Sequence, residues 1–180
     1  MFLKKFFSLL IFAVILIPTV GLAAEKPRVA VVPFENISIR QVPQEEKLLK
    51  QIALYVQDEV VSTEKFDPPN RMETDIKKLL DEIKFSQSDL ADPETRLEYG
   101  KMTGAQYLIL GTVTGLSKKG NDLIAHVSLR MIEVETARIY LAGRGSGKSK
   151  GDYEEVLINA AEDALNGKRG MLTMMRGGKK

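Results

Sequence analysis

The chain has 180 residues, no cysteine, one histidine and a formal net charge of +2. The lack of cysteine excludes disulfides and thiolate metal sites, and a single histidine argues against a histidine-based zinc site. Residues 168–180 carry five basic residues and no acid, so residues 25–167 have a net charge of about −5 and predict no nucleic-acid-binding face.

The N-terminal segment has the three parts of an export signal. Lys4 and Lys5 give a positive start, an apolar run follows at residues 6–20, and Ala23 and Ala24 offer a small-residue cleavage site. The run has 15 residues, whereas a membrane-spanning helix needs about 20. We therefore expect residues 1–24 to be a cleaved signal peptide rather than a retained anchor, and the mature chain to be periplasmic.

The first half of the mature chain predicts one strand and three helices. Residues 28–34 form a short β-branched apolar run, which predicts a buried strand in the middle of its sheet. Apolar residues at helical spacing predict helices at 44–63 and 73–84, separated by prolines that exclude a central strand. A third helix is expected at 92–104, with Asp92 as N-cap, Pro93 in its first turn and Gly104 as left-handed C-cap.

The second half predicts strands at 106–114 and 123–133 and a third that starts at 138–142, with turns at 118–122 and 136–137. Alternation in 123–133 favours an antiparallel meander with one solvated face. A final helix is expected at 152–165. The fold class is therefore α/β: one domain of two to three layers, in which an N-terminal strand and a three-stranded meander form a mixed sheet packed with about four helices.

Four segments carry a family resemblance: 28–36 (RVAVVPFEN), 100–114 (GKMTGAQYLILGTVT), 127–139 (VSLRMIEVETARI) and 159–165 (NAAEDAL). Together they resemble the periplasmic CsgG family, with its LpoB-like and TolB N-terminal-like relatives. The resemblance implies a periplasmic α/β domain at residues 25–166 that binds other envelope proteins. The chain departs from the family pattern in three places: it lacks the lipidated cysteine, so it is expected not to be lipidated; Ala137 replaces a turn glycine; and residues 66–71 hold two prolines where relatives often have a strand.

Residues 142–149 (AGRGSGKS) fit a loose phosphate-loop pattern, in which Lys148 and Ser149 would contact phosphate and magnesium. Only 31 residues follow, too few for the further parallel strands of a nucleotide fold. We therefore favour a flexible glycine-rich connector over a nucleotide-binding enzyme. His126 lies on the polar face of its strand and is expected to be a surface residue, and no catalytic residue, cofactor or metal site is predicted.

The function expected from the sequence is a non-catalytic, protein-binding domain of an envelope assembly, related to secretion or to activation of penicillin-binding proteins. A subunit of an oligomeric outer-membrane secretion pore is the alternative. Candidate partner-binding residues are Phe34, Glu35 and Asn36, where the first strand ends in a loop. Residues 167–180 predict a disordered basic tail, which could contact membrane or cell wall, and self-association is also open.

Overall fold

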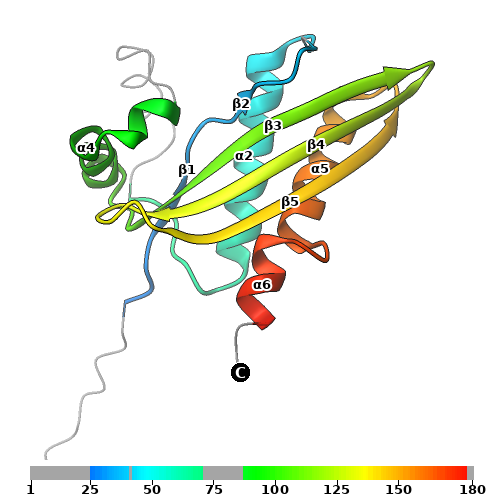
Figure 1. Ribbon diagram of the computed structural model, residues 1–180. Coiled ribbons are helices and arrows are strands. Elements are labelled where there is room, and N and C mark those ends of the chain that lie inside the picture. Colours follow the sequence, from blue (N-terminus) through cyan, green and yellow to red (C-terminus); the bar gives the residue numbers. More distant parts are fainter. Residues whose placement is uncertain (1–24, 41, 71–86, 178–180) are drawn as a thin grey trace, which may run out of the picture.

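Figure 1 shows the computed structural model, which describes residues 25–40, 42–70 and 87–177. Five strands form one mixed sheet, which confirms the predicted α/β class, and helices pack against both of its faces. The predicted signal segment 1–24 and the predicted helix 73–84 lie outside the described residues. The elements in chain order are β1 (Val29–Val31), β2 (Glu35–Asn36), α2 (Glu45–Ser62), η1 (Gln87–Ala91), α4 (Pro93–Thr103), β3 (Tyr107–Lys119), β4 (Asp122–Glu133), β5 (Ile139–Lys150), α5 (Tyr153–Asn166) and α6 (Met171–Gly177).

The strand order is β1-β3-β4-β5, and β2 pairs with β3 further along the edge that β1 occupies. Both short strands run parallel to β3, whereas β3, β4 and β5 form the predicted antiparallel meander. The outer strands of the meander are longer than predicted, since β3 extends to Lys119 and β5 to Lys150. The result is a long twisted ribbon whose far end projects beyond β1 and β2 (Figure 1).

The predicted position of the first strand in the middle of the sheet is wrong, because β1 ends the strand order. Among the described residues its outward edge meets no further strand: Arg28 forms a single bridge with Asp67, and the Gln57 side chain bonds the Val31 amide N–H at 3.0 Å and the Val29 carbonyl at 3.2 Å. The strand is nevertheless apolar on both faces, because Val29 belongs to the core under α2 and α5 while Ala30 belongs to the core beside α4. Burial on two faces therefore reflects helices above and below the strand, not neighbours on both edges.

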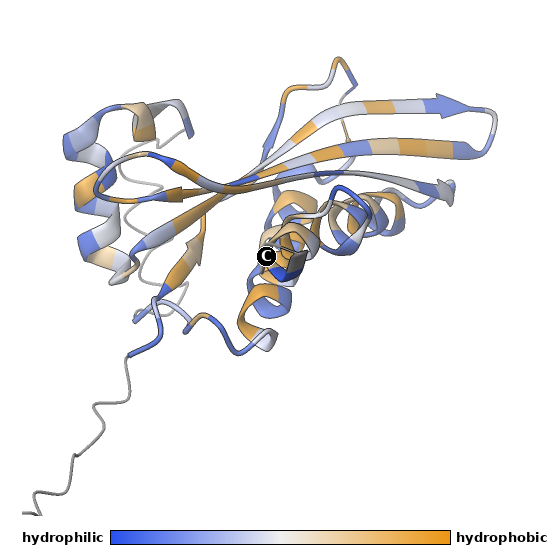
Figure 2. Ribbon diagram, turned by 60° about the horizontal axis from the view of Figure 1, so that its bottom comes forward, coloured by the Kyte–Doolittle hydropathy of each residue, from blue (hydrophilic) through white to orange (hydrophobic). Residues whose placement is uncertain are grey.

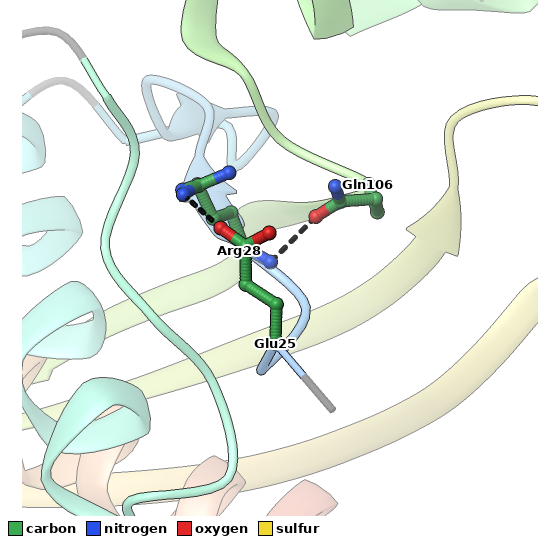
Figure 3. A network of polar contacts seen from close by, with 3 residues as sticks. All are labelled: Glu25, Arg28 and Gln106. Carbon is green, nitrogen blue, oxygen red and sulfur yellow. Dashed lines mark hydrogen bonds and ion pairs between the residues drawn. The ribbon is translucent and has the colours of Figure 1, made fainter. Parts of the chain in front are cut away.

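The entry to β1 is anchored by polar contacts (Figure 3). The Arg28 amide N–H donates to the Gln106 Oε1 at 2.6 Å, and the Arg28 guanidinium contacts the Glu25 carboxylate at 2.5 Å. Gln106 immediately precedes β3, so this contact joins the starts of the two parallel strands.

Helices α2 and α5 cover one face of the sheet, as Figures 1 and 2 show. The predicted stripe of α2 is confirmed, and its buried residues are Leu48, Ile52, Val56 and Val60. Alternate residues of β4 point into the same core, which leaves their neighbours on the opposite face of the sheet, termed here the outer face.

The glycine-rich segment 142–149 is not a connector, because it forms most of β5. Its three central glycines, Gly143, Gly145 and Gly147, alternate along the strand and all face the backbone of α5. A Cβ atom at Gly147 would lie 2.5 Å from the Ala160 amide nitrogen, closer than side chains tolerate. The helix presents alanines to this strand, so glycine and alanine together allow the strand and helix backbones to touch.

Helix α4 begins and ends as predicted. The Asp92 carboxylate accepts the Thr95 amide N–H at 2.8 Å, Pro93 occupies the first helical turn, and Gly104 ends the helix with a φ of 67°. Arg96 is buried on this helix, and its guanidinium donates to the backbone carbonyls of Leu90 and Val134 at 3.0 and 2.8 Å. This side chain therefore ties α4 to η1 and to the end of β4.

The C-terminal segment differs from the predicted disordered tail over the residues that the structure describes. Met171–Gly177 forms α6, and Met171 and Leu172 are buried against the core. The Gly170 amide turns back to the Gly167 carbonyl, so a tight turn separates α5 from α6. Burial of two large apolar side chains supplies the free energy that orders this short helix.

Candidate functional site

The predicted partner-binding residues lie together where β2 follows β1; Phe34 is buried, and Glu35 and Asn36 are partly buried and hydrogen-bonded within the fold. Phe34 is only 4% exposed. Its ring lies over Gly111 of β3, where any Cβ atom would collide with it. Phe34 therefore fills the core and fixes the position of the backbone that follows.

Glu35 connects β2 to η1. It pairs with Thr112 in the sheet, and its carboxylate accepts the Gln87 amide N–H at 2.6 Å. The Gln87 side chain then donates to the Pro33 and Gly111 carbonyls at 2.9 and 2.7 Å. This network holds the break between β1 and β2 in one geometry.

Asn36 organises the loop that follows. Its Oδ1 accepts the Ser38 amide N–H at 3.0 Å and the Ser38 hydroxyl at 2.6 Å. Its Nδ2 donates to the Glu45 carboxylate at 2.8 Å and to the Arg40 carbonyl at 3.2 Å. One amide side chain therefore fastens residues 37–40, termed here the apolar loop, to the start of α2.

The apolar loop exposes two isoleucines that sequence reasoning missed. Ile37 is 65% exposed and Ile39 is fully exposed, although both belong to the most strongly buried class of side chain. The available signal is the alternation Ile-Ser-Ile directly after a strand, which places two apolar residues where a turn normally carries polar ones. The structure thus brings the three predicted residues together as the support of an exposed apolar tip.

The segment with the phosphate-loop pattern has no loop geometry. Lys148 is exposed on the outer face of the sheet. The Ser149 hydroxyl donates to the Asp152 carbonyl at 2.5 Å, on the opposite side of the strand. Because alternate residues of a strand point to opposite faces, the two side chains cannot converge on one phosphate and its magnesium.

The described residues hold no group of three or more side chains that could bind a metal ion. His126 is exposed on the outer face, as predicted.

Burial raises the pKa of Tyr55, Tyr99 and Tyr107, and the Thr95 amide lowers the pKa of Asp92. Each shift follows from packing or helix capping, so these groups give no indication of acid–base catalysis. No described helix is both long enough and apolar enough to span a bilayer.

The fold recurs in solved bacterial proteins at low sequence identity. The PelC dodecamer from Paraburkholderia phytofirmans aligns with a TM-score of 0.52 and 14% identity, over 81% of this chain and 89% of that chain. Lipoprotein GNA1162 from Neisseria meningitidis gives 0.51 and 12%, over 84% and 99%. The NMR structure of E. coli LpoB gives 0.50 and 15%, over 69% and 57%. These likenesses establish the fold alone.

No curated protein matches the sequence. The family described as "Curli production assembly/transport component CsgG" matches residues 12–122, which is more than half of the chain. This match covers β1, β2 and β3 and the helices between them, including the apolar loop. The chain therefore belongs to the CsgG family.

Proposed function

We propose that this chain is a non-catalytic, periplasmic protein-binding domain of a bacterial envelope assembly, and that the apolar loop is its contact with a partner protein. Family membership supports an accessory role in an envelope assembly, and the signal-like segment 1–24 supports export. The observation that carries the proposal is an ordered loop that exposes Ile37 and Ile39.

Apolar side chains on an ordered loop favour binding for two physical reasons. Each isoleucine gains about 1.5–3 kcal/mol when it is moved from water into a contact. A loop already fastened by Asn36 loses little conformational entropy on binding, so more of that free energy appears as affinity. Phe34, Glu35 and Asn36 then contribute to binding by holding the loop rather than by touching the partner.

Site-specific photo-cross-linking in intact cells tests this function. A photoreactive residue at Ile39 is expected to give a discrete cross-linked product. The same residue at Ile139, which is 59% exposed at the β4–β5 turn, serves as the matched control and is expected to give none. Equal products from both positions, or none from Ile39, would contradict the proposed contact.

Substitutions then distinguish the residues that touch the partner from the residue that holds the loop in place. Ile37→Ser with Ile39→Ser is expected to abolish the complex and change the unfolding temperature little, because both side chains are largely exposed. Asn36→Ala is expected to weaken the complex less, because it frees the loop without removing apolar surface. An unchanged complex in the double variant would exclude the apolar loop as the contact.

A second candidate is a subunit of an oligomeric secretion pore. Two observations favour it: the family description names a transport component, and the PelC structure is a dodecamer. The mass of the Ile39 product distinguishes the two candidates. A ladder at multiples of the chain's own mass supports a homo-oligomer, whereas one product of a different mass supports a separate partner.

A further inference from the structure

The outer face of the sheet carries a segregated positive charge that the overall composition hides. On β5 the outward residues include Arg144, Lys148 and Lys150, and Arg130 on β4 continues the line beside Ala142. We call these four residues the cation stripe. All four are exposed, and among the described residues none of them forms an ion pair.

The stripe is linear because a strand sets its spacing. Residues two apart on one face of a strand are separated by about 6.6 Å, so Arg144 and Lys150 lie about 20 Å apart along β5. The position between Arg144 and Lys148 is Ser146, whose hydroxyl adds a hydrogen-bonding group to the same line. Asp122, which is opposite Lys150, is the one acid at the outward positions of β3, β4 and β5, and Lys119 lies on its other side.

Protection of a free sheet edge does not explain these cations. Lysines often occur on edge strands to prevent strand addition. Here, however, the Arg144 amide N–H already donates to the Arg169 carbonyl at 3.3 Å, and the Ser146 amide N–H donates to the Asp163 carboxylate at 2.9 Å. The Lys148 carbonyl in turn accepts the Asn159 side-chain amide at 3.1 Å. The loop after α5 and the helix itself therefore close this edge.

The same contacts extend the positive region. Because the Arg169 carbonyl binds the Arg144 amide, the turn that holds Lys168 and Arg169 lies against the edge of β5. Both of these side chains are exposed. Asp163 lies at this junction, and its carboxylate accepts the Ser146 amide N–H at 2.9 Å.

The chemistry of the face selects the kind of anion. The outward residues of β3, β4 and β5 beyond the α4 end are cationic, hydroxyl-bearing or small, apart from Asp122, His126 and Ile124, and they include no Phe, Tyr or Trp. Bases of single-stranded nucleic acid bind by stacking on successive aromatic side chains, whereas these outward positions offer the single imidazole of His126. A twisted ribbon also matches a flexible chain along one strand better than the plane of a membrane.

We propose that the cation stripe binds a linear anionic polysaccharide, in which carboxylates recur along the chain and the sugar hydroxyls meet the serine and threonine hydroxyls between the cations. This site is separate from the apolar loop and does not depend on a protein partner. The four cations repel one another in the free protein, and a polyanion laid along them removes that repulsion.

A binding measurement with fluorescent polygalacturonate tests this proposal. It uses the full chain, purified as it occurs in the cell. At low salt the expected result is saturable binding that weakens steeply as salt rises, because counterions are released. Neutral dextran is expected not to bind. Anionic phosphatidylglycerol vesicles and a single-stranded DNA oligomer serve as competitors and are expected to displace the polymer poorly.

Substitutions test whether the polymer binds at the cation stripe. Arg144→Gln with Lys148→Gln is expected to weaken binding by about 25-fold, since each cation at an anionic surface contributes about fivefold. Lys47→Gln with Lys101→Gln removes the same charge from exposed sites on α2 and α4 and is expected to change binding less than twofold. Thermal unfolding of both variants checks that each is folded. No binding of polygalacturonate, equal losses in the two double variants, or tighter binding of vesicles or DNA would each overturn the proposal.

Discussion

The two ends of the sheet are built differently, although the same strands run through both. At the end next to α4, residues Leu108, Ile109 and Leu110 of β3 are all buried, because helices cover both faces there. At the other end, β4 alternates buried and solvent-facing residues, because α5 covers one face only. The fold therefore combines a core covered by helices on both faces with a ribbon covered on one face only, within the same strands.

The one-sided end depends on backbone contact between β5 and α5. Gly145→Val is expected to reduce the free energy of unfolding by at least about 4 kcal/mol, because the new side chain would meet the backbone of α5 at Ala160 and Ala164. Ser146→Ala, one residue away on the outer face, is expected to change it by less than about 0.5 kcal/mol, because the backbone N–H bond to Asp163 remains. Urea unfolding followed by circular dichroism measures both. Similar losses in the two variants would show that the glycines are not required by the helix.

The two-sided end depends on a buried arginine. Arg96→Met keeps much of the side-chain volume but leaves the Leu90 and Val134 carbonyls without their donor. We expect a loss of about 2–3 kcal/mol, since each buried unsatisfied acceptor costs about 1–3 kcal/mol. Lys101→Met on the exposed side of α4 is the control. Hydrogen exchange is expected to increase in α4 and η1 before it increases in β4 and β5, and a uniform increase would contradict the separation of the two ends.

The turn between β4 and β5 carries a local strain. Ala137 has a φ of 58°, a left-handed conformation that disfavours side chains with a Cβ atom. Ala137→Gly is expected to stabilise the protein by about 0.5–1 kcal/mol, the net of relieved strain and greater freedom in the unfolded chain. A rise in the midpoint of urea unfolding checks this, and a fall would show that the turn tolerates alanine without strain.

An effect of similar size is expected at the N-cap of α4. The Thr95 amide and hydroxyl lower the pKa of Asp92 below 3.8, so its ionised form stabilises the helix above that pH. This contribution is lost as the pH falls from 3.8 through the lower pKa of the folded state. Asp92→Ala is expected to lower the Tm by about 2–4 °C at neutral pH and to match the parent protein in strong acid. Asp92→Asn, which caps without charge, is expected to show no such convergence.

The helices and the meander could be predicted because the type and spacing of their residues indicate which side chains are buried and where a helix begins and ends. The spacing of Leu48, Ile52 and Val56 marks a helix stripe, and Asp92, Pro93 and Gly104 mark both ends of α4. Glycine carries no such signal, and it is rare inside strands. The strand character of residues 142–149 therefore depends on α5, a partner that local sequence does not reveal.

The site was predictable only in part for a related reason. Phe34, Glu35 and Asn36 mark where the chain leaves the sheet, but their directions follow from contacts with Gly111, Gln87 and Ser38, which the sequence does not place. The negative charge of residues 25–167 predicts no nucleic-acid-binding face, but it does not show where the remaining cations lie. A charge count does not show where charges lie, whereas the alternation of β5 gathers Arg144, Lys148 and Lys150 on one face, with Asp122 as the one acid at the outward positions of β3, β4 and β5.

The parallel pairing of β1 with β3 has a consequence for how the chain acquires its structure. Arg28 and Gln106, which join the two strands, are 78 residues apart in the chain. A polypeptide that emerges with its N-terminus first therefore has no partner for its first strand until most of its length has followed. Such long-range pairing slows folding, so the first strand stays unpaired while the residues up to β3 are still being delivered.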